Sequence, residues 1–225
     1  PVTYVGNPLV ERLADVPGQG EARQSLGLSA EGPVVALLPG SRRSEALRMV
    51  PILLEAAERL EKSRPDSHFV VPVAGPQVAA VLDDFQAQKG PAKLVRCGDS
   101  ITATAAADCA AVTSGTATLE TAVVGTPLVV LYRLSPVTYW LARRLVQVPF
   151  IGMVNLIAGR EVAPELVQGD AEPETVAKTL ADLLADPDRL ARMRSELAEV
   201  RAHLGTSPSA RAAEVVTEVV GHESE

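Results

Sequence analysis

The stretch VVALLPGSRRSE (residues 34–45) joins a run of apolar residues to a Pro-Gly-Ser turn and then to a segment that can form a helix. The N-terminus of a helix leaves backbone N–H groups unpaired and carries about half a positive charge. A turn such as Gly40-Ser41 can therefore seat a phosphate group there without a lysine. Arg42 would add a forked, permanently charged side chain. The stretch thus predicts the strand, turn and helix of an α/β fold.

A second stretch, SGTATLE (residues 114–120), repeats the arrangement after the apolar run Cys109 to Val112. Ser114, Gly115 and Thr116 would form the turn, and Glu120 would fall in the first or second turn of the helix. A carboxylate behind a phosphate-binding turn can accept hydrogen bonds from both hydroxyls of a ribose. Its simpler role is a favourable charge near a helix N-terminus.

Both turns also allow a simpler interpretation, in which Ser41 and Ser114 or Thr116 are ordinary helix N-caps. Neither stretch matches the lysine-bearing P-loop or the triple-glycine dinucleotide turn. Their presence together in one domain favours a nucleotide site.

Strands and helical segments alternate along the chain, which predicts a Rossmann-like parallel sheet with flanking helices. Ligands of such folds bind at the carboxyl ends of the strands, where both turns fall. Pro51 predicts a bend or a fresh start in the first long helix, and residues 18–24 resemble a surface linker. Three helices are expected in the tail, beginning at Pro173, Pro187 and Pro208. The expected strands are Val34 to Leu38, His68 to Val73, Lys93 to Arg96, Cys109 to Val112 and Leu128 to Leu131.

Composition excludes several classes of protein. The net charge of -7 argues against a nucleic-acid binder, because such proteins are basic. No apolar run approaches the roughly 20 residues that span a bilayer, and no signal peptide is visible. The two cysteines, Cys97 and Cys109, suit a reducing cytoplasm, and the three histidines are scattered. We expect no metal site and no cofactor.

A series of motifs resembles the lipid-A-disaccharide synthase family, collinearly from Tyr4 to about Gly205. The family is a two-domain glycosyltransferase of the GT-B type, and the resemblance covers only its C-terminal, donor-binding half. The motifs, in order, are YVGNPL (4–9), LPGSRRSE (38–45), VPV (71–73), SGTATLE (114–120), GTP (125–127), YR (132–133) and NLIAGRE (155–161).

The resemblance implies an inverting transfer of a diacylated glucosamine from UDP-2,3-diacylglucosamine to a lipid monosaccharide phosphate, which releases UDP. It implies a UDP-sugar-binding domain at residues 1–205 and a C-terminal helix at residues 206–225 that packs on an N-terminal acceptor domain. The general base of the family belongs to that acceptor domain, so we assign no catalytic residue to this chain. We expect the chain alone to be inactive.

The resemblance also assigns site residues beyond the two turns. It places Asn155, Arg160 and Glu165 near the sugar and phosphates of the donor. The full set predicted to bind the nucleotide sugar is Gly40, Ser41, Arg42, Ser114, Gly115, Thr116, Thr118, Glu120, Asn155, Arg160 and Glu165.

The segment SPVTYWLARRLV (residues 135–146) places Tyr139 and Trp140 beside Arg143 and Arg144. Aromatic and cationic residues together suit a membrane–water interface, and the substrates of the family are lipids. Such a segment would make a peripheral contact with the inner membrane or the lipid acceptor. The alternative is an ordinary core helix anchored by its aromatic residues.

Two other functions fit the same turns. One is a different enzyme that uses UDP-N-acetylglucosamine, such as the peptidoglycan glycosyltransferase or a 2-epimerase. The other is a non-catalytic nucleotide-binding module. The YVGNPL and NLIAGRE segments favour lipid A synthesis over the first of these, and the second stays open. We expect a cytoplasmic protein.

Overall fold

The computed structural model describes residues 2–29, 31–86, 90–135, 139 and 148–222. Its strands are β1 (Val34–Leu38), β2 (His68–Pro72), β3 (Leu94–Cys97), β4 (Cys109–Thr113), β5 (Leu128–Tyr132) and β6 (Glu165–Val167). Its helices are α1 (Leu9–Arg12), α2 (Gln19–Ser25), α3 (Arg43–Ser63), α4 (Pro76–Gln86), α5 (Ser100–Ala106), α6 (Thr116–Val124), α8 (Met153–Ala158), α9 (Pro173–Leu184), α10 (Pro187–His203) and α11 (Pro208–His222).

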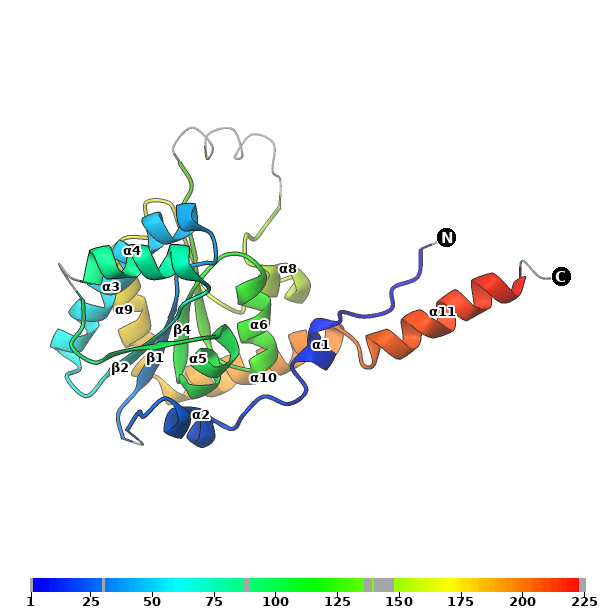
Figure 1. Ribbon diagram of the computed structural model, residues 1–225, viewed down its shortest axis with the longest axis horizontal. Coiled ribbons are helices and arrows are strands. Elements are labelled where there is room, and N and C mark those ends of the chain that lie inside the picture. The colour runs from blue at the N-terminus through cyan, green and yellow to red at the C-terminus, as the bar shows by residue number, and fades with distance from the viewer. Residues whose placement is uncertain (1, 30, 87–89, 136–138, 140–147, 223–225) are drawn as a thin grey trace.

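The six strands form one parallel sheet in the order β3-β2-β1-β4-β5-β6. This is the strand order of the Rossmann fold, and it reverses direction between β1 and β4. Because crossovers between parallel strands are right-handed, α3 and α4 cover one face of the sheet, and α5 and α6 cover the other. Helix α9 packs beside α3 on the first face (Figure 1). The predicted fold is confirmed.

The sheet forms the centre of the core. Every residue of β1 and β4 is buried, as is expected for strands covered by helices on both faces. The apolar runs that predicted five strands therefore reflect two-sided burial. Four of those strands end one residue away from their predicted ends, and β1 has the predicted bounds.

Three features differ from the sequence-based expectations. The expected linker at residues 18–24 lies largely in α2, where Ala22 is buried and Arg23 donates to the carbonyl of Ala106 and the carboxylate of Asp108. Strand β6 was not predicted. A fresh helix start at Pro51 is wrong, because α3 continues through this residue. Buried side chains on both sides of Pro51 hold the helix together despite the missing N–H donor.

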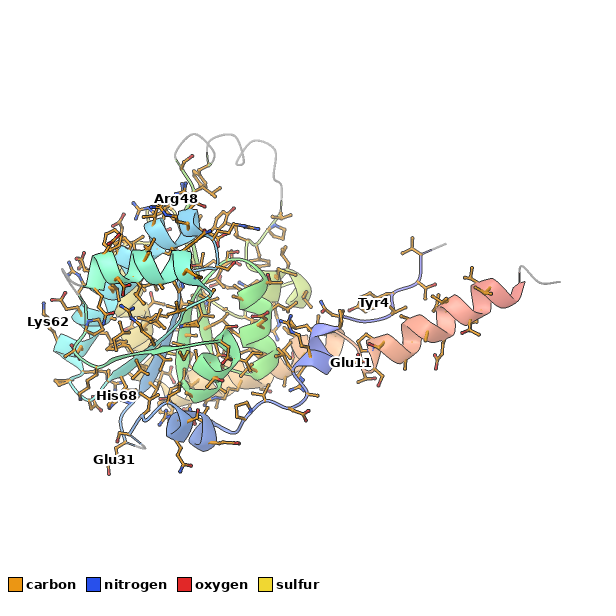
Figure 2. The ribbon with its side chains drawn as sticks, in the orientation of Figure 1. Tyr4, Glu11, Glu31, Arg48, Lys62 and His68 are labelled. Atoms are coloured by element: carbon orange, nitrogen blue, oxygen red, sulfur yellow. The ribbon has the colours of Figure 1, made fainter. Side chains whose placement is uncertain are left out.

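The first and last parts of the described chain lie side by side (Figure 1). The Tyr4 hydroxyl and the Asn7 N–H both donate to the carbonyl of Leu204, at 3.3 and 2.8 Å. Glu11 of α1 accepts hydrogen bonds from the backbone N–H and the hydroxyl of Ser209, at the start of α11. Figure 2 shows Tyr4 and Glu11 at this end of the molecule.

Helix α11 extends away from the sheet and its covering helices (Figure 1). Val216 and Val219 on this helix are 62% and 57% exposed. The three predicted tail helices are confirmed as α9, α10 and α11, each beginning at the expected proline.

Candidate functional site

The two turns singled out in the sequence meet in one cavity. Strands β1 and β4 are neighbours, with Leu38 opposite Val112, so the turns that follow them leave the same edge of the sheet. The cavity has a volume of about 460 Å³. It lies at the point where the strand order reverses, which is where open α/β sheets bind ligands. Its lining comprises residues 38–42, 45, 72, 74, 98–100, 113–117 and 120.

The turn after β4 presents the N-terminus of α6 to the cavity. Gly115 is the N-cap and has no side chain that could bond to the first N–H groups of the helix. Thr116 and Ala117 begin the helix and line the cavity. Ser114 is already engaged, because its N–H donates to the Leu131 carbonyl and its hydroxyl to the Ile151 carbonyl. The arrangement can stabilise an anion through the first turn of α6.

The turn after β1 is built differently. Gly40 has φ of +93°, and a Cβ atom there would lie 2.5 Å from Oε2 of Glu45. The Ser41 and Arg42 N–H groups donate to that same oxygen at 3.2 and 3.3 Å. Glu45 thus occupies the backbone N–H groups of Ser41 and Arg42, in the turn that the sequence predicted to bind phosphate. The Arg42 side chain remains 80% exposed at the rim, where it donates to Oε1 of Glu45 at 2.9 Å.

Glu120 points both carboxylate oxygens toward donors of the protein. Arg12 Nη2 donates to Oε1 at 2.5 Å, and the Ser100 hydroxyl donates to Oε2 at 3.0 Å. The Glu120 side chain is 19% exposed and lines the cavity, while that of Arg12 is 62% exposed. Ser100 begins α5, whose N-cap Asp99 accepts a hydrogen bond from the Thr102 N–H at 2.7 Å.

Sequence reasoning gave no role to Glu45, Ser100 or Arg12. For Glu45 a signal was present, since a glutamate three residues after a helix N-cap is the spacing of a capping box. The contacts of Glu120 with Ser100 and Arg12 join residues 20 and 108 positions apart. No local sequence pattern predicts contacts between residues so far apart in the chain.

Four predicted site residues do not line this cavity. Thr118 is fully buried, and its hydroxyl donates to the Gly115 carbonyl at 2.7 Å. Arg160 forms ion pairs with Glu196 and Glu199 of α10. The other two are Asn155 and Glu165.

Asn155 and Glu165 organise a neighbouring loop. The Asn155 amide donates to Oε1 of Glu165 at 2.8 Å, and Glu165 accepts from the N–H groups of Ile151 and Gly152, each at 2.8 Å. Ile151 in turn accepts the Ser114 hydroxyl. The pair therefore supports the turn at Ser114 from behind, and the predicted contact of Asn155, Arg160 and Glu165 with a ligand stays a prediction.

The aromatic and basic segment lies mostly outside the described residues. Trp140, Arg143 and Arg144 are among those not described, and of Tyr139 the structure gives a backbone hydrogen bond to Ser135 and partial burial. In the part of the chain that the structure describes, no helix has the length and apolar character to cross a bilayer. The same part holds no group of three or more potential metal-ligating His, Cys, Asp and Glu side chains.

Comparison with known proteins identifies relatives along nearly the whole chain. The family model described as lipid-A-disaccharide synthetase matches residues 1–220. The lipid-A-disaccharide synthase of Syntrophus aciditrophicus is 41% identical over 217 residues, which is 96% of this chain and 56% of that protein. The lipid-A-disaccharide synthase of Pseudomonas syringae pv. tomato is 44% identical over 187 residues, which is 83% of this chain and 49% of that protein. The chain thus spans about half the length of these relatives.

Solved structures share the fold at low identity. UDP-GlcNAc 2-epimerase from Neisseria meningitidis, bound to UDP-GlcNAc, aligns with a TM-score of 0.59 and 14% identity, covering 96% of this chain and 54% of the other. Sucrose-phosphate synthase from Thermosynechococcus elongatus aligns with a TM-score of 0.60 and 14% identity, covering 96% of this chain and 52% of the other. At these identities the likeness shows a common architecture, in which this chain matches about half of each structure.

Proposed function

The chain belongs to the lipid-A-disaccharide synthase family, and from this premise we propose that it is the donor-binding half of a glycosyltransferase. The reaction would transfer a diacylated glucosamine from UDP-2,3-diacylglucosamine to a lipid monosaccharide phosphate and release UDP. The observation that carries the proposal is the cavity in which the first turn of α6, Arg42 and Glu120 come together.

Each of these groups suits one part of a UDP-sugar. The first N–H groups of α6 suit the diphosphate, because the helix N-terminus favours negative charge. Arg42, exposed at the rim, supplies a guanidinium that can bind phosphate oxygens in a forked geometry. The Glu120 carboxylate suits the ribose hydroxyls, since ionised carboxylates act only as acceptors.

The proposed chemistry is a direct displacement at the anomeric carbon of the donor sugar, with inversion. As UDP departs, negative charge develops on its diphosphate. N–H groups at Thr116 and Ala117, together with Arg42, would stabilise that charge more strongly in the transition state than in the ground state. The acceptor hydroxyl needs a general base, and we place that base on an N-terminal acceptor domain outside this chain.

The same acceptor domain is the proposed partner of α11. This helix exposes Val216 and Val219, and exposed apolar side chains on a helix face favour burial against a partner. Residues 206–225 would then be the segment that joins the two halves. We further propose that residues 135–146 contact the inner membrane or the lipid acceptor on the cytoplasmic side.

Calorimetric titration with UDP, UMP and ADP tests the donor site. The chain should bind UDP more tightly than UMP, which lacks the second phosphate, and more tightly than ADP, which carries another base. Equal affinity for all three would contradict the proposal. UDP binding without transfer, even after an acceptor domain is supplied, would instead favour a non-catalytic nucleotide-binding module.

A further inference from the structure

Glu120 is held from two elements that belong to neither turn of the cavity. Arg12 comes from α1 and bonds to Oε1 at 2.5 Å, while Ser100 comes from the start of α5 and bonds to Oε2 at 3.0 Å. The two partners approach different oxygens, so the orientation of the carboxylate is set from both sides. A glutamate side chain has several rotatable bonds, and fixing it before a ligand arrives reduces the entropy lost on binding.

The occupied positions leave a defined set of acceptors. An ionised carboxylate offers about four lone-pair sites, two on each oxygen. Arg12 and Ser100 each use one site on a different oxygen, so each oxygen retains a site for a further donor. A ligand with two adjacent hydroxyl groups can fill both, one on each oxygen. Ser100 also lines the cavity, and its hydroxyl oxygen keeps lone pairs of its own.

We propose that Arg12 and Ser100 are positioning residues, which hold the Glu120 carboxylate so that it selects a nucleotide with two adjacent ribose hydroxyls over its 2′-deoxy analogue. The proposal rests on the proposed function, because it assumes that a nucleoside diphosphate occupies the cavity. It adds two residues that touch no reacting atom and act through Glu120.

The exposure of the Arg12 side chain distinguishes a positioning role for this residue from a purely structural role. The Arg12 side chain is 62% exposed, and ion pairs with such an exposed member contribute little to the free energy of unfolding. Removing Arg12 should therefore leave stability nearly unchanged. Selectivity should change, because a site that is built to bond a hydroxyl discriminates strongly against a ligand that lacks it.

The test compares the dissociation constants of UDP and 2′-deoxy-UDP by calorimetry. Wild type should prefer UDP by about tenfold or more, as expected for one hydrogen bond to a charged group. In Arg12→Gln and Ser100→Ala the preference should fall toward unity. The affinity for 2′-deoxy-UDP should change little in both variants. Arg12→Lys retains a cationic donor and should recover part of the preference.

Glu11→Gln is the matched control. Glu11 neighbours Arg12 on α1 and bonds to Ser209 instead of Glu120. It should keep the preference of wild type, whereas an equal loss would trace the effect to a displaced α1 and overturn the proposal. So would an unchanged preference in Arg12→Gln and Ser100→Ala.

The remaining outcomes separate the two proposals. Wild-type binding of UDP and 2′-deoxy-UDP with equal affinity overturns the positioning role and leaves a UDP site standing. Absence of any UDP binding by wild type overturns the proposed function and the positioning role together.

Discussion

The Glu45 carboxylate accepts two hydrogen bonds from Arg42. The Arg42 backbone N–H donates to Oε2 of Glu45 at 3.3 Å, and its guanidinium donates to Oε1 at 2.9 Å. A single carboxylate thus closes the turn after β1, starts α3 and orients the exposed arginine at the cavity rim. We therefore expect Glu45 to affect both the stability of the turn and the binding of a ligand by Arg42.

Replacing Glu45 with alanine should destabilise the protein by about 1 kcal/mol, the usual effect of losing a helix-capping interaction. Urea unfolding measures the change. Glu55→Ala is the control, since Glu55 pairs with Arg59 in the middle of the same helix, and such pairs contribute only about 0.2–0.5 kcal/mol. Equal losses in the two variants would show that the turn does not depend on Glu45.

Arg42→Ala should weaken UDP binding roughly tenfold or more, because it removes a charged hydrogen-bond donor from the cavity rim. Arg160→Ala is the informative comparison. Its guanidinium pairs with Glu196 and Glu199 away from the cavity, although sequence resemblance assigns it to the donor. Calorimetric titration of both variants with UDP shows which arginine contributes to UDP binding. A large loss in Arg160→Ala alone would support the role implied by the resemblance and contradict that of Arg42.

The chain alone should form no disaccharide from UDP-diacylglucosamine and the lipid monosaccharide acceptor, and should hydrolyse the donor slowly at most. Proximity and acid–base catalysis supply many orders of magnitude in rate, and both require the proposed acceptor domain. Product analysis with and without that domain, taken from the same source, is the measurement. Turnover by this chain alone would mean that it carries a general base.

Trp140 is the only tryptophan in the chain, so its fluorescence reports on the aromatic and basic segment. On contact with anionic vesicles its emission should shift to the blue. Salt should weaken the shift, because each basic residue near such a surface contributes only about 1 kcal/mol and is screened within a Debye length. Emission that is already blue and indifferent to vesicles would identify a core helix instead.

Cys97 should react with iodoacetamide only at high pH. Burial raises the pKa of its thiol to about 11, and the thiolate is the reactive form. Since the thiolate is scarce well below that pKa, the alkylation rate should rise about tenfold per pH unit between pH 8 and pH 10. Mass spectrometry gives the rates. Cys97→Ser is the control and should react negligibly while folded, because burial also raises the pKa of Cys109. A pH-independent rate would contradict the raised pKa of the Cys97 thiol.

The fold was largely predictable because strands that are buried on both faces of a sheet consist of continuous apolar runs, which are visible in the sequence. Strand β6 was not predicted because it is a three-residue edge strand that begins with Glu165, and all its residues are only partly buried. Helix α2 escaped because Gly18 and Gly20 suggest a linker, whereas contacts with α5 and the partners of Arg23 stabilise a helix there.

The candidate site was predictable to the extent that its parts are local. A turn and the helix behind it lie within a few residues of one another, which is why the sequence indicated the N-terminus of α6 and Glu120. Whether a backbone donor is free is a different question. The Glu45 carboxylate accepts hydrogen bonds from the backbone N–H groups of Ser41 and Arg42. Whether these N–H groups are free to bind a ligand depends on the rotamer of Glu45, which the sequence does not reveal.

The contacts between the first and last segments also bear on the order of folding. Tyr4 bonds to Leu204 across 200 residues of chain, and Ser209 bonds to Glu11 across 198. During synthesis the segment around Tyr4 is therefore made well before its partners. Because contacts between residues so distant in sequence require closure of a very long loop, we expect this segment to dock only after the sheet has formed.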